Sequence, residues 1–374
     1  SGDPVGSCGW LGDECCRGMT CAAASESPQP RCSSPQRNNC AAPIGRPMAS
    51  GWVAEGLDEA QVADGEAYHC ALYHDGDLRR PAGWHMDSAR HLLDLAVPHI
   101  TDGALVVDYG SGTGGSAIEL LRVLDERGIS IELILVDPLV SWFAKARDLL
   151  GHRDDVHFEL SISQDESGNT VFRELDEMLA GRKADVIISS STLHLIPEKA
   201  LGDLARQFAG SLVPGGVFVW DSGDVESGIR PPNAACLHDP YRSVRENLRD
   251  DESRQAMLAE MREEDAARAE RRVDRIFPVP FTVDVIVEAL TNAGFTSEIS
   301  DQIVNFSNDD AARFILVPRL AEIAAPLIEG EKRNSAIRES VGYVLSQMRE
   351  AGTASDSGYR SHWLYGLHAI PRLK

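Results

Sequence analysis

A glycine-rich turn at residues 108–115 carries the side chains best suited to bind a ligand. Its sequence is DYGSGTGG; it follows the apolar run 104–107 and precedes a segment, 117–124, whose apolar residues recur at helical spacing. A strand-to-helix turn this tight needs glycine, because the backbone must adopt positive φ and bring bare N–H groups close to a ligand. The turn therefore predicts a nucleotide-type pocket.

A second acidic residue closes the next apolar run. Residues 131–136 are followed by Asp137, which lies 23 residues after Gly114. A carboxylate at this position can accept hydrogen bonds from both hydroxyls of a ribose. The spacing Gly110-x-Gly112-x-Gly114 is not the G-x-G-x-x-G of the dinucleotide fingerprint.

These two blocks resemble the class I S-adenosylmethionine-dependent methyltransferases, whose first motif is acidic-x-Gly-x-Gly-x-Gly and whose second strand ends in a ribose-binding acid. Residues 184–194 resemble the family's fourth strand and its loop, and 212–221 its turn and fifth strand. The match covers roughly residues 92–221, and part of 281–370 fits the usual ending of the fold. The resemblance implies an α/β protein with a Rossmann-like seven-stranded sheet, helices on both faces and an antiparallel final strand at 362–369.

The same resemblance implies S-adenosylmethionine as the cofactor. Asp108 and Gly110 would lie near its amino-acid part and Asp137 at its ribose. The family usually offers an acid to the adenine after the third strand, but residues 161–166 depart from that pattern, which leaves Asp165 or Ser163. The expected cofactor-binding residues are Asp108, Gly110, Ser111, Gly112, Gly114, Asp137, Pro138, Asp165 and Ser190.

Methyl transfer from a sulfonium is an in-line displacement that requires alignment of the nucleophile and, for some acceptors, removal of a proton. Open α/β sheets place ligands at the carboxyl ends of their strands. His194, in the loop after the fourth strand, is the best-placed base, although a structural histidine fits the sequence equally. Asp221 and Tyr241 are the other catalytic candidates.

Polar and aromatic residues outside the motif blocks could enclose an acceptor. In the family, an N-terminal segment often folds over the cofactor, whereas a plain connecting loop is the alternative. The candidates from this segment are Tyr73, His74, Trp84 and His85. An acceptor carboxylate would favour Arg242 or Arg79, because guanidinium binds it bidentately. The Asp and His residues show no recognisable metal-ligand spacing, so no metal is expected.

Composition limits the classes of partner. The chain has 374 residues and a formal net charge of −22, the opposite of what a phosphate-binding surface needs, so no nucleic-acid partner is expected. No apolar run approaches the ~20 residues of a membrane-spanning helix, so no membrane partner is expected either. The expected protein is soluble and cytoplasmic, with a small molecule as substrate.

The cysteines are concentrated in the first 50 residues. Six of the eight lie there, at Cys8, Cys15, Cys16, Cys21, Cys32 and Cys40. A disulfide-stapled module and a zinc site are both conceivable, and the absence of a Cys-x2-Cys pair favours disulfides. Disulfides conflict with the cytoplasmic location that the resemblance implies.

The expected organisation has three parts. Residues 1–50 form the Cys-rich segment, 51–100 a helical cap, and 101–374 the methyltransferase domain, with a helical lid at about 230–276 and a helical insertion at about 308–350. Apolar stripes in the insertion fit a core or a dimer face, so a homodimer is among the expected assemblies.

The sequence thus predicts methyl transfer to a metabolite or natural product held under a helical lid. The alternative hypothesis is a protein that binds S-adenosylmethionine for another chemistry or for regulation, with the Cys-rich segment as an interaction module.

Overall fold

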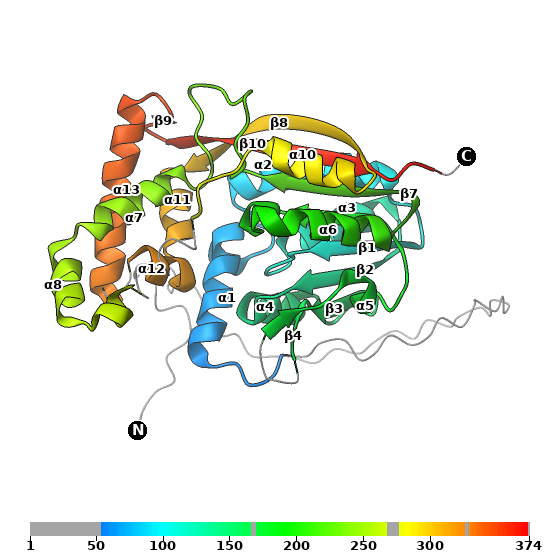
Figure 1. The fold of residues 1–374 in the computed structure, drawn as a ribbon, viewed down its shortest axis with the longest axis horizontal. Helices are drawn as coiled ribbons and strands as arrows, with labels where there is room; N and C mark the ends of the chain where they lie inside the picture. The colour runs from blue at the N-terminus through cyan, green and yellow to red at the C-terminus, as the bar shows by residue number, and fades with distance from the viewer. Residues whose placement is uncertain (1–53, 166–169, 268–276, 326–327, 329, 373–374) are drawn as a thin grey trace, which may run out of the picture. The chain divides into compact units, whose positions relative to one another are not determined.

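A single large sheet organises the protein in its computed structural model, which describes residues 54–165, 170–267, 277–325, 328 and 330–372 (Figure 1). The strand order is β3-β2-β1-β6-β7-β10-β8, and β9 pairs with β10. The strands are β1 (Ala104–Tyr109), β2 (Ile131–Asp137), β3 (Val156–Leu160), β6 (Ala184–Ser190), β7 (Leu212–Ser222), β8 (Thr296–Ser307), β9 (Ala354–Ser355) and β10 (Gly358–Ala369).

The first five strands of this order are parallel, whereas β10 runs antiparallel to both β7 and β8. The predicted α/β class, with an antiparallel final strand, is confirmed. Parallel neighbours need crossover connections, and these place helices on both faces of the sheet. The central strands are therefore buried on both sides, which explains why 104–107 and 131–136 are nearly continuous apolar runs.

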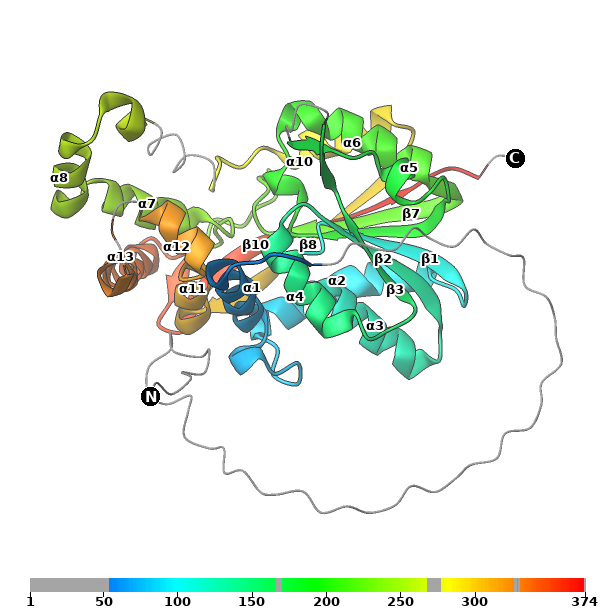
Figure 2. The same ribbon diagram turned by 90° about the horizontal axis from the view of Figure 1, so that it is seen from below.

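Figure 2 shows the two helical layers. One face is covered by α2 (Gly83–Ala96), α3 (Gly115–Arg127) and α4 (Val140–Leu150), and the other by α5 (Leu175–Met178), α6 (Glu198–Ser211) and α10 (Val283–Asn292). The apolar stripe of α3, which includes Ala117, Leu120 and Leu124, is completely buried.

Further helices gather beyond the carboxyl ends of the parallel strands. α7 (Asp239–Arg249) and α8 (Glu252–Glu260) follow β7, while α11 (Asn308–Ile315), α12 (Pro318–Ala324) and α13 (Gly330–Glu350) follow β8. α7 packs against α12 and α13. α1 (Glu59–Leu72) and the short helix η1 (His74–Gly76) precede α2, and α1 packs against α4.

Two local predictions were wrong. From the sequence alone we expect one helix over residues 170–180, but Thr170–Phe172 forms β5, which pairs antiparallel with β4 (Ile162–Gln164), and only Leu175–Met178 is helical. The residues Thr-Val-Phe favour an extended backbone, and this preference prevails over the helical pattern. Trp84 and His85 are predicted in a loop, but they lie in the first turn of α2, which begins at Gly83.

The predicted Cys-rich segment, 1–50, lies outside the described residues. Within the described part of the chain, no helix combines the length and the apolar composition that a bilayer span requires.

One buried carboxylate joins α1 to α4 and α12. Asp64 accepts hydrogen bonds from Trp142 Nε1 at 2.7 Å, Ser141 Oγ at 3.2 Å and the Arg319 backbone amide at 2.9 Å. The neighbouring Gly65 allows the close approach of α1 and α4, because a Cβ there would lie 2.6 Å from the Ser141 carbonyl oxygen. The position of α1 over the sheet therefore depends on Asp64.

Asp64→Ala should lower the free energy of unfolding by about 2–4 kcal/mol, because it leaves the buried Trp142 and Ser141 donors without an acceptor. Urea denaturation measures this loss. The control is Glu66→Ala, on the same helix as Asp64. It removes a partly exposed ion pair between Glu66 and Lys145 of α4, and it should cost less than about 1 kcal/mol. Equal losses in the two variants would show that Asp64 does not hold α1 in place.

Candidate functional site

The glycine turn between β1 and α3 has the left-handed backbone that its sequence predicts. The φ angles of Gly110, Gly112 and Gly114 are 78°, 55° and 82°, values that residues with a Cβ rarely adopt. Gly110 is required for a second reason, since a Cβ there would lie 2.2 Å from Thr192 Oγ1 in the loop after β6.

Asp137 fastens this turn to the end of β2. Its Oδ2 accepts a hydrogen bond from the Gly112 amide and its Oδ1 one from the Leu139 amide, each at 2.7 Å. Burial raises the pKa of Asp137 to about 6, against the opposing effect of these two amides. Each carboxylate oxygen offers a further lone pair, so Asp137 can hold the turn and still accept from a ligand hydroxyl.

Asp108 is a buried carboxylate that has no cationic side chain as a hydrogen-bond partner among the described residues, although the backbone amide of Ala117 partly offsets the rise in its pKa. It is 0% exposed, and neither oxygen has a partner at hydrogen-bond geometry among the described residues. Burial, followed by the charges of Asp137 and Asp221, raises its pKa to about 8. The hydroxyls of Ser111 and Thr113 in the same turn are also buried without a partner. Buried polar groups are normally hydrogen-bonded, so these atoms indicate that a ligand completes the turn.

Asp221, at the end of β7, is the third buried acid. Its Oδ1 accepts hydrogen bonds from Ser190 Oγ at 2.9 Å and the Ser191 amide at 2.8 Å, while its Oδ2 has no partner at hydrogen-bond geometry in the described part of the chain. Burial raises the pKa of Asp221 to about 7. We call Asp108, Asp137 and Asp221, at the carboxyl ends of β1, β2 and β7, the carboxylate cluster.

An aromatic pair from two helices covers the glycine turn. Tyr68 of α1 stacks on Trp142 of α4, with ring centroids 3.8 Å apart. Both rings lie 3.8 Å from the position that a Cβ on Gly112 would take. Burial, and then the charges of Asp137 and Asp221, raise the pKa of Tyr68. α1 therefore brings a phenol close to the carboxylate cluster.

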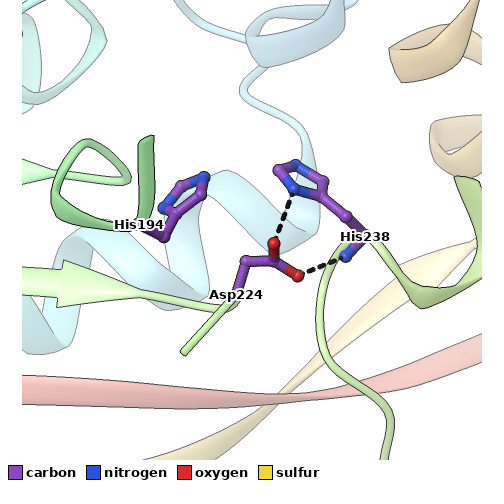
Figure 3. A group of neighbouring side chains, drawn as sticks. All are labelled: His194, Asp224 and His238. Carbon is purple, nitrogen blue, oxygen red and sulfur yellow. Dashed lines mark hydrogen bonds and ion pairs between the residues drawn. The ribbon is translucent and has the colours of Figure 1, made fainter. Parts of the chain in front are cut away.

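A second polar group lies at the same edge of the sheet (Figure 3). It consists of His194 after β6, Asp224 after β7 and His238 just before α7, and one ligand atom from each lies within 4.8 Å of the others. His238 Nδ1 lies 3.0 Å from Asp224 Oδ2, and the His238 amide donates to Oδ1 at 3.0 Å. We call these three residues the histidine cluster. The sequence analysis missed this grouping; the only signal for it was that His194 and Asp224 each follow a strand end.

Burial and charged neighbours set the protonation states of Asp224 and His194 in the histidine cluster. Arg242 donates to both oxygens of Asp224, at 2.8 and 3.0 Å, and to Asp239 at 2.9 Å. Burial alone would raise the pKa of Asp224, but His238, Arg242 and His194 outweigh it and hold that pKa well below its ordinary value. Burial, and then the charge of His238, lower the pKa of His194 to about 3. His194 is therefore a neutral imidazole at physiological pH.

The residues before β1 predicted to bind the acceptor contact three different elements, α3, β8 and α11. The Tyr73 hydroxyl donates to Glu119 of α3 at 2.8 Å, and His85 Nε2 lies 3.3 Å from that hydroxyl, so both pack behind the glycine turn. Trp84 stacks on Phe306 with ring centroids 4.8 Å apart. His74 Nε2 lies 3.3 Å from Asp310 Oδ1 of α11.

The remaining predicted residues lie around the two clusters or farther out. Tyr241 of α7 is buried and stacks on Phe314, with centroids 5.3 Å apart. The Arg242 guanidinium, predicted to bind an acceptor carboxylate, is already bound to Asp224 and Asp239. Pro138 and Asp165 are exposed; Asp165 directly follows β4.

Comparisons with known proteins show low similarity. No family model matches the chain, and no curated protein matches it. Among solved structures it resembles the cyclopropane synthase MmaA2 from Mycobacterium tuberculosis, with 13% identity, 83% of this chain and 97% of that chain covered, and a TM-score of 0.44. It also resembles the cyclase SpnF, with 17% identity, coverage of 87% and 100%, and a TM-score of 0.41. A third is phosphoethanolamine N-methyltransferase 2 from Haemonchus contortus in complex with S-adenosyl-L-methionine, with 15% identity, coverage of 84% and 59%, and a TM-score of 0.42.

Gly110→Ala should destabilise the protein by more than Gly103→Ala, measured as the free energy of unfolding in urea. The two glycines have nearly the same φ, 78° and 80°, but a Cβ at Gly103 meets nothing within 4 Å, whereas at Gly110 it meets Thr192. Gly103→Ala should cost about 1–2 kcal/mol from backbone strain alone. Similar losses in the two variants would contradict the tight packing of the loop after β6 on the turn.

Proposed function

We propose that this protein transfers a methyl group from S-adenosylmethionine to a small-molecule acceptor. The observation that carries the proposal is the carboxylate cluster around the glycine turn. Burying a carboxylate without a cation costs free energy. This cost raises the pKa of the group and favours its protonated form. A ligand with a positive sulfonium, a positive amino group and a ribose diol would relieve this cost. S-adenosylmethionine has all three.

The residues of the turn fit such a ligand. Asp108 would pair with its amino group, and the lone pairs of Asp137 left free by Gly112 and Leu139 would accept from the ribose hydroxyls. The hydroxyls of Ser111 and Thr113 would gain the partners that they lack. α3 begins directly after the turn, at Gly115, and the positive end of its helix dipole would favour a carboxylate there. Pro138, Ser190 and Asp165 stay in the proposed cofactor set, as the resemblance implies.

When bound, S-adenosylmethionine supplies a methyl group on a positively charged sulfur that departs as a neutral thioether. The chain must exclude water, align the acceptor and take up its proton. Asp221 is the proposed proton acceptor, because its Oδ2 has no partner at hydrogen-bond geometry among the described residues and its pKa, raised by burial against the hydrogen bonds of Ser191, Ser190 and Trp363, is about 7, close to the operating pH. His194 and Tyr241 would line the acceptor side of the site, beyond β6 and on α7.

The proposed acceptor combines an apolar part with an oxygen or nitrogen nucleophile. The residues around His238 are aromatic: its ring centroid lies 5.1 Å from that of Phe277, 5.9 Å from Phe314 and 6.0 Å from Tyr241. α7, which carries Tyr241, would form part of the predicted lid, and α11, which carries Phe314, part of the predicted helical insertion. The experiments below test the cofactor and the acceptor separately.

The full chain should bind S-adenosylmethionine in a calorimeter and form S-adenosylhomocysteine when supplied with its acceptor. The acceptor can be sought with isotope-labelled cofactor in a metabolite extract, analysed by mass spectrometry. Binding without turnover on any acceptor would favour the alternative, a regulatory or non-methylating role. Failure to bind the cofactor at all would overturn the proposal.

Binding of the cationic cofactor should release a proton from Asp108 and strengthen as pH rises toward about 8. The reason is that the ligand-free carboxyl, with a pKa of about 8, holds its proton until a cation favours the ionised form. Asp108→Asn should abolish this release and weaken binding by about 1.5–3 kcal/mol. Calorimetry in two buffers of different ionisation enthalpy measures the proton released.

A control variant and a stability measurement accompany this experiment. Asp185→Asn, at the amino end of β6, should leave affinity and proton release unchanged, because an amide oxygen there can still accept from the Leu105 amide. Without ligand, the contribution of Asp108 to stability is greatest below the ordinary carboxyl pKa of 3.8, and it is lost progressively as pH rises from there to about 8. The melting temperature of the ligand-free protein should therefore fall over this range, and less so in Asp108→Asn. An equal fall in both proteins would contradict the assignment.

A further inference from the structure

We propose that the histidine cluster, His194, Asp224 and His238, binds a divalent transition-metal ion. The proposal goes beyond the proposed methyl transfer and does not depend on it. The three residues come from the loop after β6, the loop after β7 and the residue before α7, and Figure 3 shows their polar atoms turned toward one another.

The donor atoms select the class of ion. Two imidazoles and one carboxylate suit Fe²⁺, Co²⁺ or Zn²⁺, whereas Mg²⁺ and Ca²⁺ prefer oxygen donors alone. One ligand atom from each residue lies within 4.8 Å of the other two. His238 Nδ1 and Asp224 Oδ2 are 3.0 Å apart, which is the separation of two ligand atoms bound at right angles about 2.1 Å from one ion.

The surrounding hydrogen bonds orient the ligands. His194 Nδ1 lies 3.0 Å from Ser222 Oγ, which leaves Nε2 of the same ring for an ion. Arg242 holds Asp224 through both oxygens, at 2.8 and 3.0 Å. Metal-bound histidines and carboxylates typically have such outer partners, which fix their orientation. The ion would take the place of the hydrogen bond between His238 Nδ1 and Asp224 Oδ2.

The charges leave room for a cation. Arg242 is the guanidinium that faces the cluster, and it is bound to two carboxylates, Asp224 and Asp239. The two carboxylates together carry one charge more than this guanidinium. The ligands are also rigidly held, because His194 and His238 are 5% exposed and Asp224 is 1% exposed. A buried set of ligand atoms with excess negative charge is better suited to bind a cation than to bind water.

Three protein ligands leave coordination positions open. These positions lie beyond β6 and β7, the edge to which the acceptor is assigned above, so an ion there could bind acceptor oxygen atoms; this consequence alone rests on the proposed function. Metal content and cofactor binding are measured separately, so failure of one proposal is distinguishable from failure of the other.

Co²⁺ titration of the chelator-treated full chain, under anaerobic and reducing conditions, tests the site. Visible absorption and the cobalt content after dialysis are the readouts. The wild type should bind one equivalent more than His194→Gln or His238→Gln, or bind that equivalent at least about tenfold more tightly. His157→Gln is the control, because it removes a histidine that lies 3.2 Å from Glu132 in a partly exposed pair; it should match the wild type.

The cysteines of residues 1–50 are present in all four proteins, so any cobalt that they bind cancels in the comparison. Equal cobalt content and equal visible spectra in all four proteins would overturn the proposal. Circular dichroism checks that each variant folds. If a glutamine variant does not fold, X-ray absorption of the cobalt-loaded wild type decides: two imidazole ligands on a cobalt ion support the site, and their absence overturns it.

Discussion

The burial of three carboxylates at one edge of a parallel sheet is the constraint on which the rest of this structure depends. Asp108, Asp137 and Asp221 lie at the carboxyl ends of β1, β2 and β7 and are almost completely buried. Burial raises the pKa of each, and the charges of Asp137 and Asp221 raise that of Asp108 further. Only Asp137 has both oxygens engaged, by amides of the turn and of the loop after β2. The ligand-free protein therefore holds a site prepared for positive charge.

The helices beyond the sheet complete that site from two sides. α1 is held by the hydrogen bonds of Asp64 to α4 and α12, and it places Tyr68 and Trp142 over Gly112. On the other side, α7 begins directly after His238 and packs against α12 and α13. Cofactor-side and acceptor-side residues are thus attached to the same group of helices.

Two groups of different chemistry lie close together at this edge. The carboxylate cluster consists of oxygen atoms alone, whereas the histidine cluster combines nitrogen and oxygen atoms. Ser222 connects them: it follows Asp221 directly in β7, and its hydroxyl contacts His194 and accepts from the Asp224 amide. The end of β7 therefore supplies residues to both.

Local sequence determined the turn between β1 and α3, the acid at the end of β2 and most of the alternating strands and helices. These features depend on the spacing of apolar residues and glycines over short stretches, which reflects the geometry of each element. Local pattern was insufficient at 170–172, where pairing with β4 prevails over a helix. Only the tertiary structure decided that Asp108 is completely buried, that Asp137 binds Gly112, and that His194 meets Asp224 and His238. Each of these depends on which strand ends and loops become neighbours, and that is settled by long-range strand pairing and by the packing of helices on the sheet.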